Sequence, residues 1–143
     1  MKYLVSACLA GIPCRFDGKE KTVPEIKALY EQWQAIPVCP ELLAWLWVPR
    51  IPCEGGWKGV IGEDGKDYTE LFLVGAKKTL EIIQENNIHT AILRSKSPSC
   101  WCGKIFDGTF SDTLIDGDGV TTKLLKEHGI QCMSEKKFLD SYS

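Results

Sequence analysis

The chain lacks the features that mark membrane, disordered and nucleic-acid-binding proteins. Its 143 residues contain no apolar run of about 18 residues, the length that spans a membrane. Its net charge is only −2, which disfavours a general nucleic-acid or anionic-membrane surface. With 44% hydrophobic and 25% charged residues, it is too apolar and too weakly charged to be disordered. We therefore expect a globular protein in which residues 1–143 form a single domain.

Familiar nucleotide and zinc motifs are absent as well. The sequence has neither the dinucleotide fingerprint nor the Walker lysine pattern, so we interpret Gly117-Asp118-Gly119 as a turn that leads into a helix. No two cysteines have the C-x-x-C spacing that is typical of structural zinc sites. Six residues separate Cys8 from Arg15, which is out of register with the C-x₅-R loop of low-molecular-weight tyrosine phosphatases and arsenate reductases.

The seven cysteines are the most informative count in the composition. Residues 1–7 carry one charge and a short apolar run, too little for a secretory signal peptide, so we expect a cytoplasmic protein. The cytosol keeps thiols reduced, and an odd number of cysteines leaves one without a disulfide partner. Several cysteines in turn-rich segments of such a protein indicate a metal, a cluster or thiol chemistry.

Short apolar strands alternate with amphipathic helices along the chain. This alternation predicts a small doubly wound α/β fold, with a mainly parallel sheet of about four to five strands and helices on both faces. The strand order stays open. We expect strands at 3–7, 35–38, 90–94 and 130–133, and helices at 24–34, 41–47, 67–86, 120–128 and after 134. Residues 49–66 are expected to be irregular, with a small hairpin as one option, and residues 106–118 to be turn-rich.

Three local signals refine these elements. Pro37 predicts that its strand is short or near a sheet edge. Asp67 has the character of a helix N-cap, with Glu70 at the matching third helical position. The helix at 67–86 is largely apolar on both sides, so we expect it to be well buried.

Three cysteines follow three successive strands. Cys8 comes directly after the first strand, Cys39 directly after the second, and Cys100 lies in the loop after the third. Ligands of an open parallel sheet bind outside the carboxyl ends of its strands, so we expect these thiols to converge there. Soft thiolates select zinc, copper(I) or iron–sulfur clusters. Three thiolates on a 4Fe-4S cluster would leave one iron free as a Lewis acid for substrate.

The other four cysteines are less informative. Cys132, inside a predicted strand, and Cys53 are expected to be small buried apolar residues. Cys14 and Cys102 each lie close to a suspected ligand, so their roles remain open.

Two polar residues stand next to the suspected ligands. Glu41, in Cys39-Pro40-Glu41, is either a general acid or base or a carboxylate that faces a helix dipole. Ser97 belongs to the hydroxyl-rich segment 95–100, which forms a turn or orients a substrate carbonyl or water. The Asp-Gly pairs within 15–18 and 106–110 indicate turns.

Six motifs, in order, resemble those of the short bacterial family of TudS-like thiouracil desulfidases. They are VSACLAG at 5–11, RFDG at 15–18, CPE at 39–41, SPSC at 97–100, FDGTF at 106–110 and GDGVT at 117–121. The resemblance extends from about residue 3 to residue 135, nearly the whole chain.

The resemblance implies an oxygen-sensitive 4Fe-4S cluster held by Cys8, Cys39 and Cys100, whose fourth iron binds the sulfur of a thiolated nucleobase. Glu41 and Ser97 match the positions expected to act in catalysis, and Ser99 is a weaker candidate. The implied reaction is the removal of sulfur from thiouracil or a related thiolated nucleobase by non-redox hydrolysis, which needs no nicotinamide or flavin. The implied partner is this small molecule, with no nucleic acid and no membrane.

The chain departs from the family pattern beside two ligand loops. Trp101 stands where the family commonly has a glycine after its last ligand cysteine, and Cys102 follows it. Ala44, Trp45 and Trp47 replace small residues and proline. These aromatic residues can narrow the pocket or stack on a planar base, and Cys102 can compete for iron.

Two alternatives remain open at this point. One is a non-catalytic metal- or cluster-binding module, which would tolerate Glu41→Gln. The other is a metal-free thiol enzyme, with Cys8 or Cys100 as the nucleophile and Cys14 or Cys102 as the resolving thiol. Such an enzyme requires a lowered thiol pKa.

Overall fold

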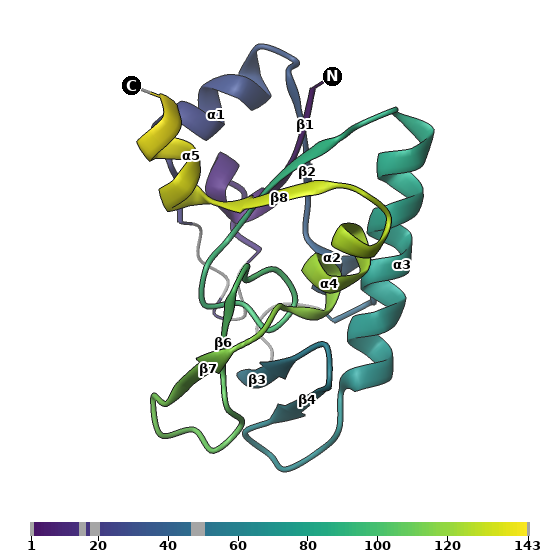
Figure 1. Ribbon diagram of the computed structural model, residues 1–143, viewed down its shortest axis with the longest axis vertical. Coiled ribbons are helices and arrows are strands. Elements are labelled where there is room, and N and C mark those ends of the chain that lie inside the picture. The colour runs from purple at the N-terminus through teal and green to yellow at the C-terminus, as the bar shows by residue number, and fades with distance from the viewer. Residues whose placement is uncertain (1, 15–16, 18–20, 47–50, 143) are drawn as a thin grey trace.

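A four-stranded parallel sheet forms the centre of the molecule (Figure 1). The computed structural model describes residues 2–14, 17, 21–46 and 51–142. The strands lie in the order β2-β1-β5-β8. They are β1 (Tyr3–Ser6), β2 (Ala35–Val38), β5 (Thr90–Leu93) and β8 (Gln131–Ser134). This confirms the predicted parallel sheet, and β2, which contains Pro37, lies at an edge as expected.

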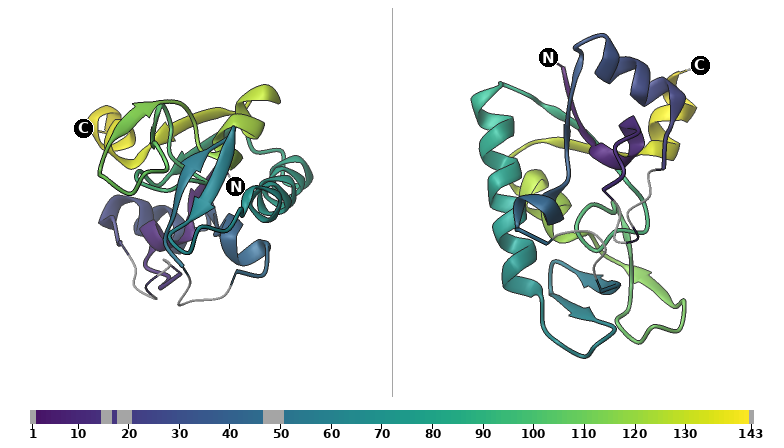
Figure 2. Two further views of the ribbon diagram at one scale, coloured as in Figure 1. Left: turned by 90° about the horizontal axis from the view of Figure 1, so that it is seen from below. Right: turned by 180° about the vertical axis from the view of Figure 1, so that it is seen from behind.

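Helices cover both faces of this sheet, also as predicted. Successive side chains of a strand point to opposite faces. Val5 accordingly packs in one core cluster with Ile26 and Phe138, whereas Leu4 packs in another with Leu125. Figures 1 and 2 show α1 and α5 together on one side and α3 on the other. The helices are η1 (Ala7–Ala10), α1 (Pro24–Glu31), α2 (Pro40–Leu43), α3 (Thr69–Glu85), α4 (Val120–Glu127) and α5 (Glu135–Tyr142).

Two antiparallel hairpins lie side by side at one end of the molecule, away from its termini (Figures 1 and 2). They are β3 (Cys53–Gly56) with β4 (Gly59–Gly62), and β6 (Lys104–Phe106) with β7 (Leu114–Asp116). Buried Glu54 joins them, because its carboxylate accepts the N–H groups of Gly108 at 3.1 Å and Phe110 at 3.0 Å. The first hairpin was an expected option. The second was not predicted, because all three residues of β7 are exposed and its sequence does not alternate.

Helix ends differ from the predictions in three places. The first helix ends at Glu31 rather than near residue 34, and α2 ends at Leu43 rather than at 47. Trp47 lies outside the described residues. The cap of α3 is displaced by one residue: Tyr68 is the N-cap. The Asp67 carboxylate still accepts the backbone N–H of Thr69 at 2.8 Å. Asp67 therefore stabilises the start of α3 although it precedes the N-cap.

The expectation that α3 is well buried on both sides was wrong. Phe72, Ala76 and Ile83 are buried, but Leu71 and Val74 on the other side are each 41% exposed. A helix in the outer layer of a sandwich buries only the side that faces the sheet and its neighbours. Within the part of the chain that the structure describes, no helix combines the length and apolarity needed to cross a membrane.

Candidate functional site

A pocket opens at the carboxyl ends of β1, β2 and β5, where ligands of an open α/β sheet bind. We call it the thiol pocket. Its cavity volume is about 20 Å³. Its lining residues are Ser6, Ala7, Cys8, Cys14, Val38, Cys39, Pro40, Glu41, Arg94, Ser97, Ser99 and Cys100. All five residues that the sequence analysis singled out for the site therefore lie on one pocket.

The three expected ligand thiols reach this pocket from three different strand ends. Cys8 lies in η1 directly after β1, and Cys39 is the N-cap of α2 directly after β2. Cys100 comes from the loop after β5. Cys8 and Cys100 are buried and Cys39 is half-buried. The parallel sheet thus brings together thiols that are up to 92 residues apart (8 to 100) in the chain.

Cys14 is a fourth thiol in the same pocket, although the sequence left its place open. It is only 3% exposed, and its thiol hydrogen-bonds with those of Cys39 and Cys8. The Cys39 thiol also donates to the Cys14 carbonyl oxygen at 3.7 Å. The thiol contacts first, and burial second, raise the pKa of Cys14.

The turn that carries Cys100 is organised by Ser97. The Ser97 Oγ accepts the backbone N–H of Ser99 at 3.2 Å and that of Cys100 at 3.1 Å. The N–H of Trp101 closes the turn by donating to the Ser97 carbonyl at 3.0 Å. Burial raises the pKa of the Cys100 thiol to about 12, against the opposing effect of a hydrogen bond with Ser6.

The N-terminus of α4 is bonded to this Cys100 turn. The first N–H groups of a helix have no partner within it. Here the N–H of Val120 donates to the Pro98 carbonyl at 2.9 Å, and that of Thr121 to the Ser99 carbonyl at 2.8 Å. The segment 117–119 is therefore a turn into a helix, as predicted, and these helix N–H groups hold a protein loop rather than a phosphate.

Two glycines permit the close approaches that shape the pocket. A Cβ on Gly119 would lie 2.5 Å from the Ser99 carbonyl oxygen, and one on Gly75 would lie 2.0 Å from the Pro40 carbonyl oxygen. Gly119 thus lets α4 reach the Cys100 turn, and Gly75 lets α3 reach the start of α2. The sequence analysis missed both, although an isolated glycine inside a helix is a signal of close packing.

Three hydrogen bonds with residues distant in the sequence also position the loop after β5. The buried Glu135 carboxylate, from α5, accepts the N–H of Ser95 at 3.0 Å and its Oγ–H at 3.2 Å. The N–H of Arg94 donates to the Ser6 Oγ at 2.9 Å, which ties the end of β5 to that of β1. Sequence analysis missed these partners because they are 40 and 88 residues apart.

Glu41 lies on the boundary of the thiol pocket and a second cavity. It is half-buried in the first turn of α2. The second cavity, which we call the aromatic cavity, has a volume of about 320 Å³. Its lining residues are Glu41, Trp45, Leu46, Ile51, Cys53, Tyr68 and Phe72. Trp45 therefore contributes to this cavity. Trp101 instead packs edge to face on Phe106, with the ring centroids 5.3 Å apart.

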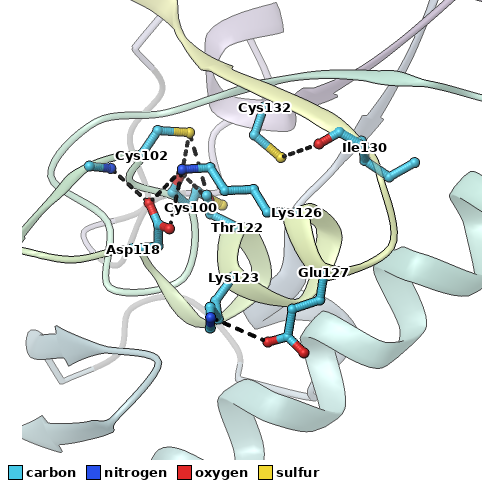
Figure 3. A network of polar contacts seen from close by, with 10 residues as sticks. Cys100, Cys102, Asp118, Thr122, Lys123, Lys126, Glu127, Ile130 and Cys132 are labelled. Carbon is cyan, nitrogen blue, oxygen red and sulfur yellow. Dashed lines mark hydrogen bonds and ion pairs between the residues drawn. The ribbon is translucent and has the colours of Figure 1, made fainter.

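The remaining cysteines lie outside the thiol pocket. The Cys102 thiol points toward the Thr122 Oγ1 at 3.9 Å, beside the ion pair of Lys126 and Asp118 (Figure 3). Burial raises the pKa of the Cys102 thiol, and it raises that of Cys132 to about 12. Cys132 and Cys53 are half-buried, so they are less enclosed than the expected core cysteines.

The thiols of the pocket have the donor chemistry of an iron–sulfur cluster site. Among the described residues, no three His, Cys, Asp or Glu side chains are gathered closely enough to hold a single ion. The thiol pocket nevertheless presents several soft donors around a common space. Buried thiols become thiolates when they coordinate a cation.

Comparison with known proteins places this chain in a family. A 40% identical relative, the uncharacterized protein YbbK of Bacillus subtilis (strain 168), aligns over 147 positions that cover 96% of this chain and 97% of the relative. A solved structure of TudS, a 4Fe-4S-dependent thiouracil desulfidase, has a TM-score of 0.91 at 39% identity, covering 97% of this chain and 93% of that one. The 2-thiouracil desulfurase family matches residues 3–137. This chain belongs to the 2-thiouracil desulfurase family.

Proposed function

We propose that this chain is a desulfidase that removes sulfur from thiouracil or a related thiolated nucleobase by non-redox hydrolysis. The observation that carries the proposal is the meeting of three strand-end thiols with Glu41 and Ser97 on one pocket, in a member of this family. The solved TudS relative, 39% identical, is 4Fe-4S-dependent. The substrate is a small molecule, and we propose the cytoplasm as its compartment because reduced thiols and an oxygen-sensitive cluster suit it.

Cys8, Cys39 and Cys100 are the proposed ligands of a 4Fe-4S cluster. When bound through three thiolates, such a cluster supplies one iron as a Lewis acid for the thione sulfur. Their placement suits this task, because Cys8 and Cys39 directly follow two neighbouring strands and the turn of Cys100 is held by Ser97 and α4. Cys14 is a fourth thiol within reach of the same space.

Glu41 is the proposed general acid and base. Its carboxylate lies on the pocket wall two residues after a proposed ligand. From there it can take a proton from the attacking water or give one to a ring nitrogen of the base. The reaction exchanges sulfur for oxygen: the C=S group and water become C=O and hydrogen sulfide. No electrons are transferred, so the reaction requires no nicotinamide or flavin.

Ser97 is proposed to orient the base or the attacking water. Its oxygen already accepts two backbone N–H groups, so its hydroxyl hydrogen is the part that can be donated to a ligand. Ser99 is the weaker candidate because its hydroxyl is paired with the Thr121 hydroxyl at 2.7 Å.

A metal-free thiol enzyme with Cys100 as its nucleophile is less favoured. A nucleophilic cysteine needs a lowered pKa. The pKa of Cys100 is instead raised to about 12 by burial, and that of Cys14 is raised as well. Coordination to a metal-containing group is the arrangement that keeps such buried thiols deprotonated.

Turnover under anaerobic conditions tests the proposal. The reconstituted protein should convert 2-thiouracil to uracil and release one sulfide per uracil. Glu41→Gln should lower kcat by about 100-fold or more, as expected for loss of a general acid or base. Glu70→Gln is the matched control, because Glu70 is an exposed glutamate in the first turn of α3. Full activity of Glu41→Gln, or no turnover by the intact protein with its cluster, would reject the proposal.

A further inference from the structure

The geometry points to a substrate that is larger than thiouracil itself. We propose that the aromatic cavity binds an uncharged, apolar substituent on the side of a thiopyrimidine ring opposite its sulfur. The preferred substrates would then be 2-thiopyrimidines with an apolar group at C5. This inference rests on the proposed function, because it assigns the sulfur to the thiol pocket.

Glu41 lines both cavities, so the thiol pocket and the aromatic cavity are neighbours at this carboxylate. A pyrimidine with its sulfur among the thiols places a ring edge beside this carboxylate. In a 2-thiopyrimidine, C5 is directly across the six-membered ring from C2, which carries the sulfur. A substituent at C5 therefore extends away from the thiols, past Glu41 and into the aromatic cavity.

The lining of the aromatic cavity selects for apolar groups. Apart from Glu41, its described walls are the side chains of Trp45, Leu46, Ile51, Cys53, Tyr68 and Phe72. The Tyr68 hydroxyl already donates to the Asp64 carboxylate at 2.8 Å. Glu41 is the only charged residue among these walls, and a carboxylate repels anionic substituents. The cavity volume of about 320 Å³ is at the lower end of the usual range of small-molecule sites, roughly 300–1,000 Å³.

Trp45 is the wall residue that can be tested without disturbing the core. It is 67% exposed, in contrast to Phe72, which is 2% exposed. The Lys78 ammonium lies 5.3 Å from the centre of its ring and donates to the Leu43 carbonyl at 2.9 Å. The indole is thus held at the cavity by contacts that do not depend on a ligand, which lowers the entropy cost of binding against it.

Affinities of unreactive oxo compounds test the inference without turnover. Calorimetry on the anaerobic holoenzyme would compare uracil, 5-propyluracil and 5-(2-carboxyethyl)uracil. We expect 5-propyluracil to bind at least about tenfold more tightly than uracil. Complete burial of the three propyl carbons would give a larger gain in affinity than this. The carboxyethyl compound has a similar length and should bind no more tightly than uracil.

Two tryptophan variants locate the effect. Trp45→Ala should reduce the preference for the propyl compound over uracil to about threefold or less. Trp33→Ala is the matched control, because Trp33 is also exposed but does not line either cavity. Both tryptophans have a left-handed backbone, with φ 60° at Trp33 and 65° at Trp45. Equal affinity for uracil and 5-propyluracil, or an undiminished preference in Trp45→Ala, would overturn the inference.

Turnover separates this inference from the proposed function. The kcat/KM for 5-propyl-2-thiouracil should exceed that for 2-thiouracil through a lower KM, with kcat unchanged. Turnover of 2-thiouracil without any propyl preference would overturn the inference and leave the proposed function standing. Tighter binding of 5-propyluracil, lost in Trp45→Ala, without turnover of either thio compound would support the cavity assignment and overturn the desulfidase proposal.

Discussion

At the scale of single residues, Ser97 shows how one side chain serves structure and is available for chemistry. The Ser97 oxygen accepts two N–H groups of the turn that carries Cys100, and Ser97 also lines the thiol pocket. The sequence alone presented a turn serine and a catalytic serine as alternatives. The structure shows that the Ser97 oxygen accepts the hydrogen bonds of the turn. The proposed catalytic role uses the hydroxyl hydrogen, which these two bonds do not involve.

Replacing this hydroxyl should affect stability as well as activity. Ser97→Ala leaves two buried N–H groups without their acceptor, so the free energy of unfolding should fall by about 1–3 kcal/mol. Urea denaturation of the anaerobic protein measures this change. Ser111→Ala, which removes an exposed hydroxyl, should change it by less than about 0.5 kcal/mol. Equal stability of the two variants would show that the Ser97 hydroxyl does not hold the turn.

The placement of individual residues was predictable where it depended on strand ends. Cys8 and Cys39 directly follow strands, so the topology alone brings them together. Cys14 was not predictable, because it lies four residues beyond η1 in a loop whose course no periodicity defines. Glu135 was not predictable either, since its partner Ser95 lies on a distant segment.

At the scale of elements, the main feature is the contact between α4 and the Cys100 turn. Backbone N–H groups of the helix bind carbonyls of the turn, and Thr122 donates to the Cys100 carbonyl at 2.7 Å. This contact requires the absence of a side chain at Gly119. The position of a proposed ligand is thus determined by a helix that follows it in the sequence.

A methyl group at this contact should disturb both fold and site. Gly119→Ala should lower the free energy of unfolding by about 1–3 kcal/mol, because the added Cβ would overlap backbone atoms of the turn. It should also lower the iron content per chain. Gly59→Ala is the control, since its Cβ would lie 3.7 Å from the nearest atom, an ordinary contact. Unchanged stability and iron content of Gly119→Ala would contradict the account of this contact.

The start of α3 offers a pH-dependent test. The Thr69 hydroxyl and backbone N–H both donate to the Asp67 carboxylate and lower its pKa. A lowered pKa stabilises the fold above the carboxyl's unfolded value, about 3.9, and this stability is lost as the pH falls through the folded value. Asp67→Ala should therefore lower Tm at pH 7, and the difference from wild type should shrink below pH 4.

Asp140→Ala, on the exposed side of α5, is the control for this experiment. Thermal unfolding followed by circular dichroism between pH 3 and pH 7 gives both sets of Tm values. A difference for Asp67→Ala that stays constant over this range would show that the ionised carboxylate is not the stabilising group.

Element types were more predictable than their ends and exposure. The strand at 35–38 and the start of α1 at Pro24 follow from local signals and were predicted correctly. The burial of α3 was overestimated because an apolar pattern does not reveal how many sides of a helix have neighbours. The hairpin of β6 and β7 was missed because long-range partners such as Glu54, rather than its own sequence, hold it.

At the scale of the whole molecule, the hairpins are connected to the sheet and its helices by hydrogen bonds and by an apolar cluster in which Val60 packs with Phe72 and Val120. The N–H of Trp57, between β3 and β4, donates to the Asp118 carbonyl at 3.0 Å, next to the start of α4. The Asp118 carboxylate accepts the N–H of Gly103 at 2.8 Å. We propose that the chain is one domain, in which the hairpins extend the wall around the carboxyl edge of the sheet.

The alternation of strands and helices predicted this architecture, but it could not give the strand order. Order depends on which strands pair across the sheet, and such pairing leaves no local signal. Once β1 lies between β2 and β5, its carboxyl edge is the natural ligand site, and the convergence of the thiols there follows.

The most direct test of the account is the iron and acid-labile sulfide content of anaerobically reconstituted protein. The wild type should contain about four irons and four sulfides per chain, the composition of a 4Fe-4S cluster. Cys100→Ser should lose most of both, whereas Cys132→Ser, outside the thiol pocket, should retain them. Zinc in place of iron, or full desulfidase activity without any metal, would contradict the proposal that this pocket holds a catalytic iron–sulfur cluster.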